Sequence, residues 1–297
     1  LIFVHGAGFD HTIWVMPARS FARHGWRVVA LDLPGHGRSQ GQALTSIAQM
    51  ADWLAQVIDA VSPNQQASVV GDSMGSLVAM SLAARHANKV QKLALLGTSA
   101  PMPVADVLLN AALDNDQAAI DMTNTWSHSA RGSLGSSQNP GVSNLHIGER
   151  LLQQASAGVF HTDLAACNGF TADGLAEVKQ PTLVIIGDED KMTPPRAGLA
   201  VADQLPHVQQ RRLAGCGHSM LSEQPNQVLD ELAAFLPSGP VMWLPVEAFM
   251  WMLRRPRASC KTTFASEYIR AGIFGGYSAF IRIIRRYLRL IPGPCAT

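Results

Sequence analysis

The sequence predicts an α/β fold, a doubly wound and mostly parallel sheet with helices on both faces. Short apolar runs alternate with longer amphipathic stretches from residue 1 to residue 96, and the alternation resumes at residue 182. Strands that are apolar throughout are typical of parallel sheets covered on both sides. Several of these runs are followed by short loops rich in Gly and Pro, which favour tight connections.

The elements follow one another in a regular order. We expect strands at 1–4, 27–31, 67–71, 90–96, 182–186 and 208–213, with helices at 12–24, 44–61, 74–86 and 224–236. Residues 98–178 differ, because they contain helix-like pieces separated by Gly, Ser and Asn clusters and no strong strand. The pattern therefore predicts a core formed by residues 1–97 and 179–236, interrupted by a helical insertion at 98–178.

Composition narrows the class of protein. The chain has 297 residues, of which 47% are hydrophobic and 15% charged, enough for a large core. A formal charge of +1 gives no reason to expect a nucleic-acid partner, and the spacing of the four Cys favours neither a zinc site nor a disulfide framework.

We expect a cytoplasmic setting with no signal peptide in view. The chain begins inside a predicted strand without Met, so we expect it to be truncated at its N-terminus.

The pentapeptide GDSMG at 71–75 is the first candidate for chemistry. It lies between a predicted buried strand and a predicted helix, which is the context a GxSxG nucleophile requires. The two glycines allow close backbone packing around the serine, and the following helix directs its free N–H groups toward any ligand there. Ser73 is therefore the predicted nucleophile.

A serine hydroxyl needs a base, a carboxylate that orients the base, and donors for the developing oxyanion. His218 in GCGH follows a predicted strand and is the expected base. The carboxylate is sought in GDED at 187–190, where three acidic residues compete. The glycines of HGAG at 5–8 free backbone amides, so the amides of Ala7 and Met74 are the expected oxyanion donors.

These motifs, together with DLPGHGRS at 32–39, resemble the α/β-hydrolase-fold serine hydrolases over residues 1–236. The resemblance implies an acid three residues after the glycine that ends its strand, which selects Asp190 over Asp188. It also implies that Ser73 is the nucleophile and His218 the base, and that residues 98–178, named here the cap segment, form a lid over Ser73. Many members have His where this chain has Asp72, a change expected to alter local pKa values and substrate preference.

The substrate pocket is expected to involve residues from both parts of the chain. His5, Gly6 and Asp72 are predicted on the core side, with His5 also a candidate organiser of its loop. Met102, Trp126 and Phe160 are predicted in the cap segment, with Met122 and His128 as further candidates. For any one of the cap residues, packing of the cap onto the core is the plainer interpretation. We expect neither a metal nor an organic cofactor.

The C-terminal segment departs from the fold. Residues 237–297 contain nine Arg and Lys against two Glu, and apolar residues between 273 and 287 recur at helical spacing. One hypothesis is a basic amphipathic helix that binds an anionic membrane surface, and the other is an appended tail from an altered gene end. The oligomeric state cannot be deduced from these patterns.

Three functions fit the motifs. The first is hydrolysis of a small-molecule carboxylic ester, thioester or lactone through an acyl-enzyme. The second uses the same residues on a carbon–carbon bond or for perhydrolysis. The third is a non-catalytic binding protein on the same scaffold, and the intact set of Ser, His and Asp argues against it.

Overall fold

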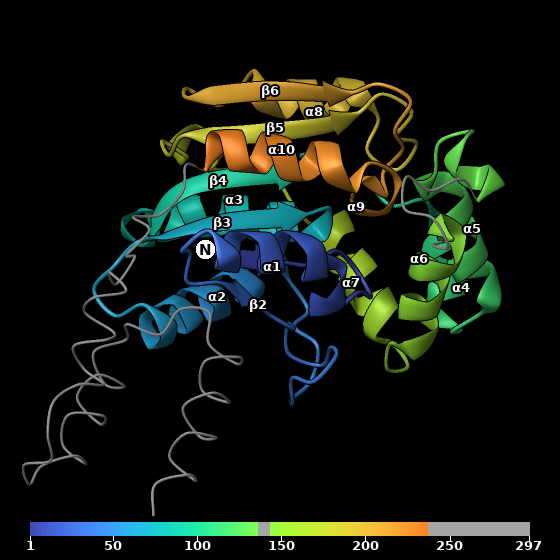
Figure 1. Cartoon of the computed structure of the whole chain (residues 1–297). Helices are drawn as coiled ribbons and strands as arrows, with labels where there is room; N and C mark the ends of the chain where they lie inside the picture. The colour runs from blue at the N-terminus through green and yellow to red at the C-terminus, as the bar shows by residue number, and fades with distance from the viewer. Residues whose placement is uncertain (136–142, 237–297) are drawn as a thin grey trace, which may run out of the picture. The chain divides into compact units, whose positions relative to one another are not determined.

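The computed structural model describes residues 1–135 and 143–236, so the predicted tail at 237–297 lies outside the described residues. Within these ranges one sheet contains six strands in the order β2-β1-β3-β4-β5-β6, with every neighbouring pair parallel (Figure 1). Their bounds are β1 Ile2–Val4, β2 Val29–Ala30, β3 Ala67–Asp72, β4 Val90–Leu96, β5 Thr182–Gly187 and β6 Val208–Leu213. The predicted class of fold is confirmed.

Helices cover both faces of the sheet. Figure 1 shows α10 (Pro225–Phe235) on one face and α3 (Met74–Arg85) and α8 (Pro195–Ala202) on the other. α2 (Ile47–Val61) packs along α3. Because β5 is buried throughout its length, its largely apolar sequence is what its environment requires.

Three predicted elements are shorter or begin later in the structure. The expected helix at 12–24 starts as a 3-10 turn, His11–Trp14, before α1 (Val15–Arg23). The helix expected from residue 44 begins at Ile47, because the side chain of Ser46 caps it by accepting the N–H of Gln49. The strand expected at 27–31 is reduced to β2, an edge strand that pairs only with the short β1.

The cap segment is helical where it is described. It contains α4 (Asp106–Leu113), α5 (Gln117–Ser127), α6 (Asn144–Gln154) and α7 (Val159–Asn168), and no strand among its described residues. α4, α5 and α6 gather beyond one end of the sheet (Figure 1). The exact bounds that we predict for core and cap stay a prediction.

Residues 1–18 and 29–236 form one compact unit, which contains all the site residues considered below. In residues 19–28, which group separately, the rings of Phe21 and Trp26 meet edge to face at 6.2 Å between centroids. Among the residues that the structure describes, no helix has the length and apolar character needed to cross a bilayer.

Parallel strands place the site. Because all six strands run the same way, the loops that leave their carboxyl ends emerge at one edge of the sheet. HGAG follows β1, Ser73 follows β3, Asp190 follows β5, and His218 follows β6. The fold therefore brings together four loops that lie far apart in the sequence.

Candidate active site

Ser73 occupies a strained turn between β3 and α3. Its backbone has φ 50° and ψ −116°, a region that residues other than Gly rarely adopt. A methyl group on Gly71 would lie 2.1 Å from the carbonyl oxygen of Gly75, and one on Gly75 would lie 2.3 Å from the carbonyl oxygen of Val4. Both glycines of the motif are therefore required by packing, and the turn presents a half-buried serine.

His218 and Asp190 form a buried pair. The Nδ1–H of His218 donates to Oδ2 of Asp190 at 2.7 Å, and both residues are buried. Oδ1 of Asp190 accepts the backbone N–H groups of Met192 and Thr193, each at 2.8 Å. These bonds fix the carboxylate, which in turn fixes the plane and tautomer of the imidazole.

Thr193 is a participant that sequence reasoning missed. Its hydroxyl donates to Oδ2 of Asp190 at 2.7 Å, and Oγ1 lies 3.1 Å from Nδ1 of His218. The hydroxyl therefore joins the two members of the pair. A threonine in an ordinary loop gives no signal of this role, although its position three residues after Asp190 is one to inspect in similar chains.

The environment of His218 favours its charged form. Burial alone lowers the pKa of the imidazole, but the charge and hydrogen bond of Asp190, with a further contribution from Asp72, outweigh burial and raise it. Nε2 has no hydrogen-bond partner among the described residues. This nitrogen is therefore free to exchange a proton with a group in the cavity.

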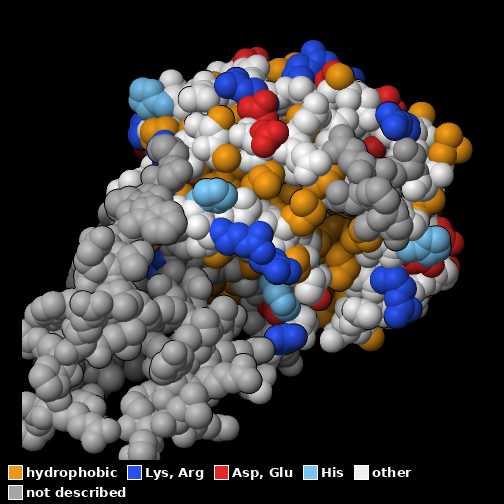
Figure 2. Space-filling view, viewed as in Figure 1, with side chains coloured by type: hydrophobic (Ala, Val, Ile, Leu, Met, Phe, Trp, Pro, Cys, Tyr) orange, Lys and Arg blue, Asp and Glu red, His pale blue; other side chains and the backbone are white. Residues whose placement is uncertain are grey.

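A cavity of about 180 Å³ lies between the strand ends and the cap segment. Both Ser73 and His218 line it, together with five residues predicted at the oxyanion site or pocket: Gly6, Ala7, Met102, Trp126 and Phe160. Asp190 is absent from its lining and lies behind His218. Figure 2 shows hydrophobic side chains gathered in a hollow on the side that carries the cap helices.

His5 does not line this cavity, contrary to the pocket role predicted for it. The side chain is fully buried, with Nδ1 donating to the carbonyl of Gly6 at 2.9 Å and Nε2 accepting the N–H of Leu33 at 3.1 Å. Burial first, and then the nearby charge of His36, lower the pKa of His5 to about 4. His5 thus organises its loop as a neutral imidazole. Neither Met122 nor His128 lines the cavity.

The two predicted oxyanion amides are differently placed. Ala7 lines the cavity, whereas Met74 begins α3 directly after Ser73 and has a buried side chain. Neither amide N–H has a hydrogen-bond acceptor among the described residues. Unpaired backbone donors are rare in folded proteins, and the N–H of Ala7 belongs to a residue that lines the cavity.

Asp72 also lines the cavity. Its carboxyl is buried and has no hydrogen-bond partner among the described residues. Burial raises its pKa to about 6, with the charge of His218 opposing the rise and the charge of Asp190 adding to it. A carboxyl that titrates near neutral pH beside Ser73 is what distinguishes this cavity chemically.

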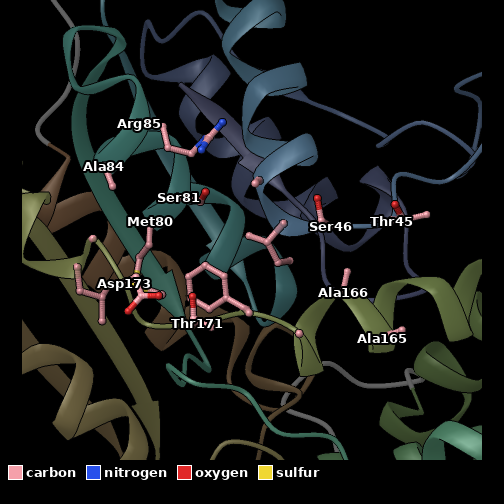
Figure 3. Close-up of a pocket in the computed structure, with 16 residues that line it drawn as sticks. Thr45, Ser46, Met80, Ser81, Ala84, Arg85, Ala165, Ala166, Thr171 and Asp173 are labelled. Carbon is pink, nitrogen blue, oxygen red and sulfur yellow. The ribbon is translucent and has the colours of Figure 1, made fainter.

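Two further features lie apart from this cavity. A second cavity has a volume of about 310 Å³ and lies between the start of α2, the end of α3 and the segment after α7 (Figure 3). None of the predicted site residues lines it.

The other feature is a cluster of possible metal ligands. Its donor atoms, from Asp10, His11 and Asp32, lie within 4.8 Å of one another, close enough to hold a metal ion. The carboxylate of Asp32 already accepts the backbone N–H groups of His11 and Arg38.

Comparison with known proteins agrees with the fold. A family model described as alpha/beta hydrolase fold matches residues 1–225, and the chain belongs to that family. It is 29% identical over 236 residues to a 2-hydroxy-6-oxononadienedioate/2-hydroxy-6-oxononatrienedioate hydrolase of Burkholderia vietnamiensis, covering 73% of this chain and 80% of the relative. It is 30% identical over 240 residues to a pimeloyl-[acyl-carrier protein] methyl ester esterase of Aromatoleum aromaticum, covering 76% and 93%.

A solved structure described as an N-acyl homoserine lactone degrading enzyme is similar over 79% of this chain and 92% of its own, with a TM-score of 0.69 and 26% identity. The relatives are named as hydrolases and esterases. The chain is accordingly a hydrolase of the α/β hydrolase fold, and the bond that it cleaves is a separate question.

Proposed function

We propose that the chain is a serine hydrolase that cleaves a small-molecule carboxylic ester, thioester or lactone through an acyl-enzyme. The observation that carries the proposal is the buried bond between His218 and Asp190, beside a cavity that the strained Ser73 also lines. A serine, a histidine with one free ring nitrogen and a fixed carboxylate are the parts that acyl transfer requires.

In the proposed reaction, Oγ of Ser73 attacks the substrate carbonyl carbon while Nε2 of His218 takes the hydroxyl proton. Asp190 holds the imidazole and stabilises its positive charge. The tetrahedral intermediate collapses when His218 returns the proton to the leaving alcohol or thiol. Water then attacks the acyl-enzyme with the same base, which releases the acid and restores Ser73.

The amides of Ala7 and Met74 are proposed to stabilise the intermediate. Both lack acceptors in the described structure, and they come from the loop after β1 and the residue after the nucleophile. Such donors act most strongly when they are aimed at the oxygen before charge develops on it. Removing one donor of this kind costs about 100- to 1,000-fold in kcat.

The size and charge of the cavity favour small substrates that are uncharged near the reacting bond. A volume of about 180 Å³ is below the range of about 300–1,000 Å³ usual for pockets that enclose drug-sized ligands. The buried Asp72 beside Ser73 would repel an anionic acyl group once it ionises. Lys191 also lines the cavity, but its side chain is exposed, so water weakens its attraction for anions.

Hydrolysis of a carbon–carbon bond is the second candidate, because several relatives are named for it. The Burkholderia vietnamiensis relative acts, by its name, on a dioate. Asp72 disfavours a carboxylate close to Ser73, so we place ester, thioester and lactone substrates first. Direct comparison of turnover of the two classes of substrate distinguishes the two candidate functions.

The deciding experiment has two parts. A fluorophosphonate probe should label the folded wild type at Ser73, with labelling lost in Ser73→Ala and strongly reduced in His218→Ala. A series of p-nitrophenyl esters of rising chain length, a thioester, a lactone and a 2-hydroxy-6-oxo-dienoate should then be assayed. Absence of a Ser73 adduct refutes the serine mechanism, whereas turnover of the dienoate alone refutes the ester assignment in favour of the second candidate.

A further inference from the structure

A buried carboxylate of the cap segment reaches the loop that carries Ala7. Asp163 lies on α7 and is fully buried. Its Oδ2 accepts the backbone N–H of Gly8 at 2.8 Å and lies 2.7 Å from Nε2 of His36. One oxygen atom thus joins α7 to the loop after β1 and to the loop after β2.

The pair between Asp163 and His36 is ionic. Nδ1 of His36 lies 3.1 Å from the carbonyl oxygen of Pro34, which can only accept, so this nitrogen carries a proton. Nε2 faces the carboxylate of Asp163 and carries the second proton. Burial lowers the pKa of His36, but the bond and charge of Asp163 outweigh burial and raise it. The imidazolium compensates the charge of a carboxylate that has no access to water.

The other oxygen of Asp163 is costly to the fold. Oδ1 is buried and has no hydrogen-bond partner among the described residues. An unsatisfied buried oxygen of this kind destabilises the folded state, because it has lost its hydrogen bonds to water without replacing them. The two bonds to Oδ2 attach α7 to the core, but a residue that served only this purpose would not need to leave Oδ1 unpaired, so the arrangement calls for a further explanation.

The loop around Ala7 supplies that explanation. On one side, the carbonyl of Gly6 accepts Nδ1–H of His5, and on the other, the N–H of Gly8 donates to Asp163. The two peptide groups that flank Ala7 are therefore anchored, while the N–H of Ala7 itself has no acceptor among the described residues, and Ala7 lines the cavity. Gly8 has φ +69°, a backbone conformation that glycine adopts at little cost and that other residues rarely take.

We propose that Asp163 is a positioning residue for catalysis: through Gly8 and His36 it holds the loop so that the N–H of Ala7 points at the substrate oxyanion. The proposal rests on the proposed function, in which that N–H stabilises the tetrahedral intermediate. Asp163 touches no reacting atom. It makes the position of an oxyanion donor depend on the docking of α7.

The test compares the wild type with Asp163→Ala, Asp163→Asn and a control, Thr162→Val. The control lies on the same helix and removes a hydroxyl whose one bond among the described residues is to the carbonyl of Gly158. Kinetics with p-nitrophenyl acetate are corrected for the rate of Ser73→Ala, and affinity is measured for a boronic acid that adds to serine and mimics the tetrahedral state. Circular dichroism and thermal unfolding verify the fold of each variant.

We expect Asp163→Ala to lower kcat by about 10- to 100-fold, less than complete loss of a donor, because the amide is misdirected rather than removed. Boronate affinity should fall in parallel with kcat/KM, with little change in KM. Asp163→Asn keeps an acceptor for the N–H of Gly8 but loses the charge, so its kcat and boronate affinity should lie between those of Asp163→Ala and the wild type. Thr162→Val should behave as the wild type does.

Unchanged kcat and boronate affinity in folded Asp163→Ala, or a loss confined to KM, would overturn the positioning role. Should Asp163→Ala fail to fold, Asp163→Asn decides by the same criteria. A wild type that neither turns over esters nor takes up the fluorophosphonate refutes the proposed function instead. Hydrogen exchange of the amides at 5–9 then tests the anchoring alone: it must accelerate in Asp163→Ala, which removes the acceptor of the Gly8 N–H, and not in Thr162→Val.

Discussion

Asp72 and His218 line the same cavity, and the charge of each changes the pKa of the other. Ionised Asp72 helps to raise the pKa of His218, and protonated His218 opposes the rise in the pKa of Asp72. Two groups that interact in this way titrate as a coupled pair. The residue before Ser73 therefore belongs to the electrostatics of the site.

The first prediction concerns the pH dependence of hydrolysis. A base must be unprotonated, so activity should fall as pH drops through the pKa of His218. Asp72→Asn removes one of the negative charges that favour the imidazolium, and the acid limb of the kcat/KM profile should move to lower pH. The profiles of wild type and variant measure the shift, with Asp203→Asn, an exposed residue at the end of α8, as the charge-matched control. An acid limb that does not move would contradict the coupling.

The second prediction concerns stability. The pKa of Asp72 is about 6 in the folded protein and about 3.8 unfolded. Between these values the folded state holds a proton that the unfolded state has released, so the wild type loses stability as pH rises through this window. Asp72→Asn carries no charge and should be the more stable protein at pH 8, by up to about 3 kcal/mol. Urea unfolding at pH 4 and pH 8 tests this, and an equal difference at both pH values would contradict it.

Much of the fold could be predicted because its signals are local. The strands at 90–96 and 208–213 have the predicted bounds, since turn residues within a few positions mark both ends of each run. The loops after β1, β3 and β6 were singled out for the same reason, and the parallel sheet brings Ala7, Ser73 and His218 to one cavity. Helix α8 was not predicted, although Pro195 at its start is a helix-initiation signal.

The remainder of the site depends on contacts that no local pattern carries. Gly8 and Asp163 are 155 positions apart, and nothing in either neighbourhood predicts their hydrogen bond. Thr193 owes its role to the loop that turns its hydroxyl toward Asp190. His5, expected at the pocket, lies in a buried environment that only the packing of the loop after β2 creates.

The third prediction concerns the contribution of the Thr193 hydroxyl to catalysis. Thr193→Val keeps the shape of the side chain but removes the hydroxyl between Asp190 and His218. A hydrogen bond to a charged group contributes about 1.5–3 kcal/mol, so kcat/KM should fall at least about tenfold, mainly in kcat. The control is Thr125→Val, at an exposed residue whose hydroxyl bonds, within the described part of the chain, to the carbonyl of Asp121 alone. Equal activity of the two variants would show that Thr193 is dispensable for orienting the pair.

The last prediction uses two glycines in helices with opposite surroundings. A methyl group on Gly75, in α3, would lie 2.3 Å from the carbonyl oxygen of Val4 and 2.8 Å from that of His5. Both are backbone atoms of β1 and its loop, so α3 must move away from the sheet and carry the Ser73 turn with it. Gly75→Ala should therefore destabilise the protein by about 1–3 kcal/mol or more and reduce hydrolysis.

Gly148, in α6, is the matched control, because a methyl group there would find its nearest neighbour at 3.7 Å, the side-chain oxygen of Asn124. Gly148→Ala should stabilise the protein by about 0.5–1 kcal/mol, since alanine is the better helix former. Urea unfolding and turnover of the best p-nitrophenyl ester measure both effects. If Gly75→Ala matched Gly148→Ala in stability and activity, close packing of α3 on β1 would not be what holds Ser73 in its strained turn.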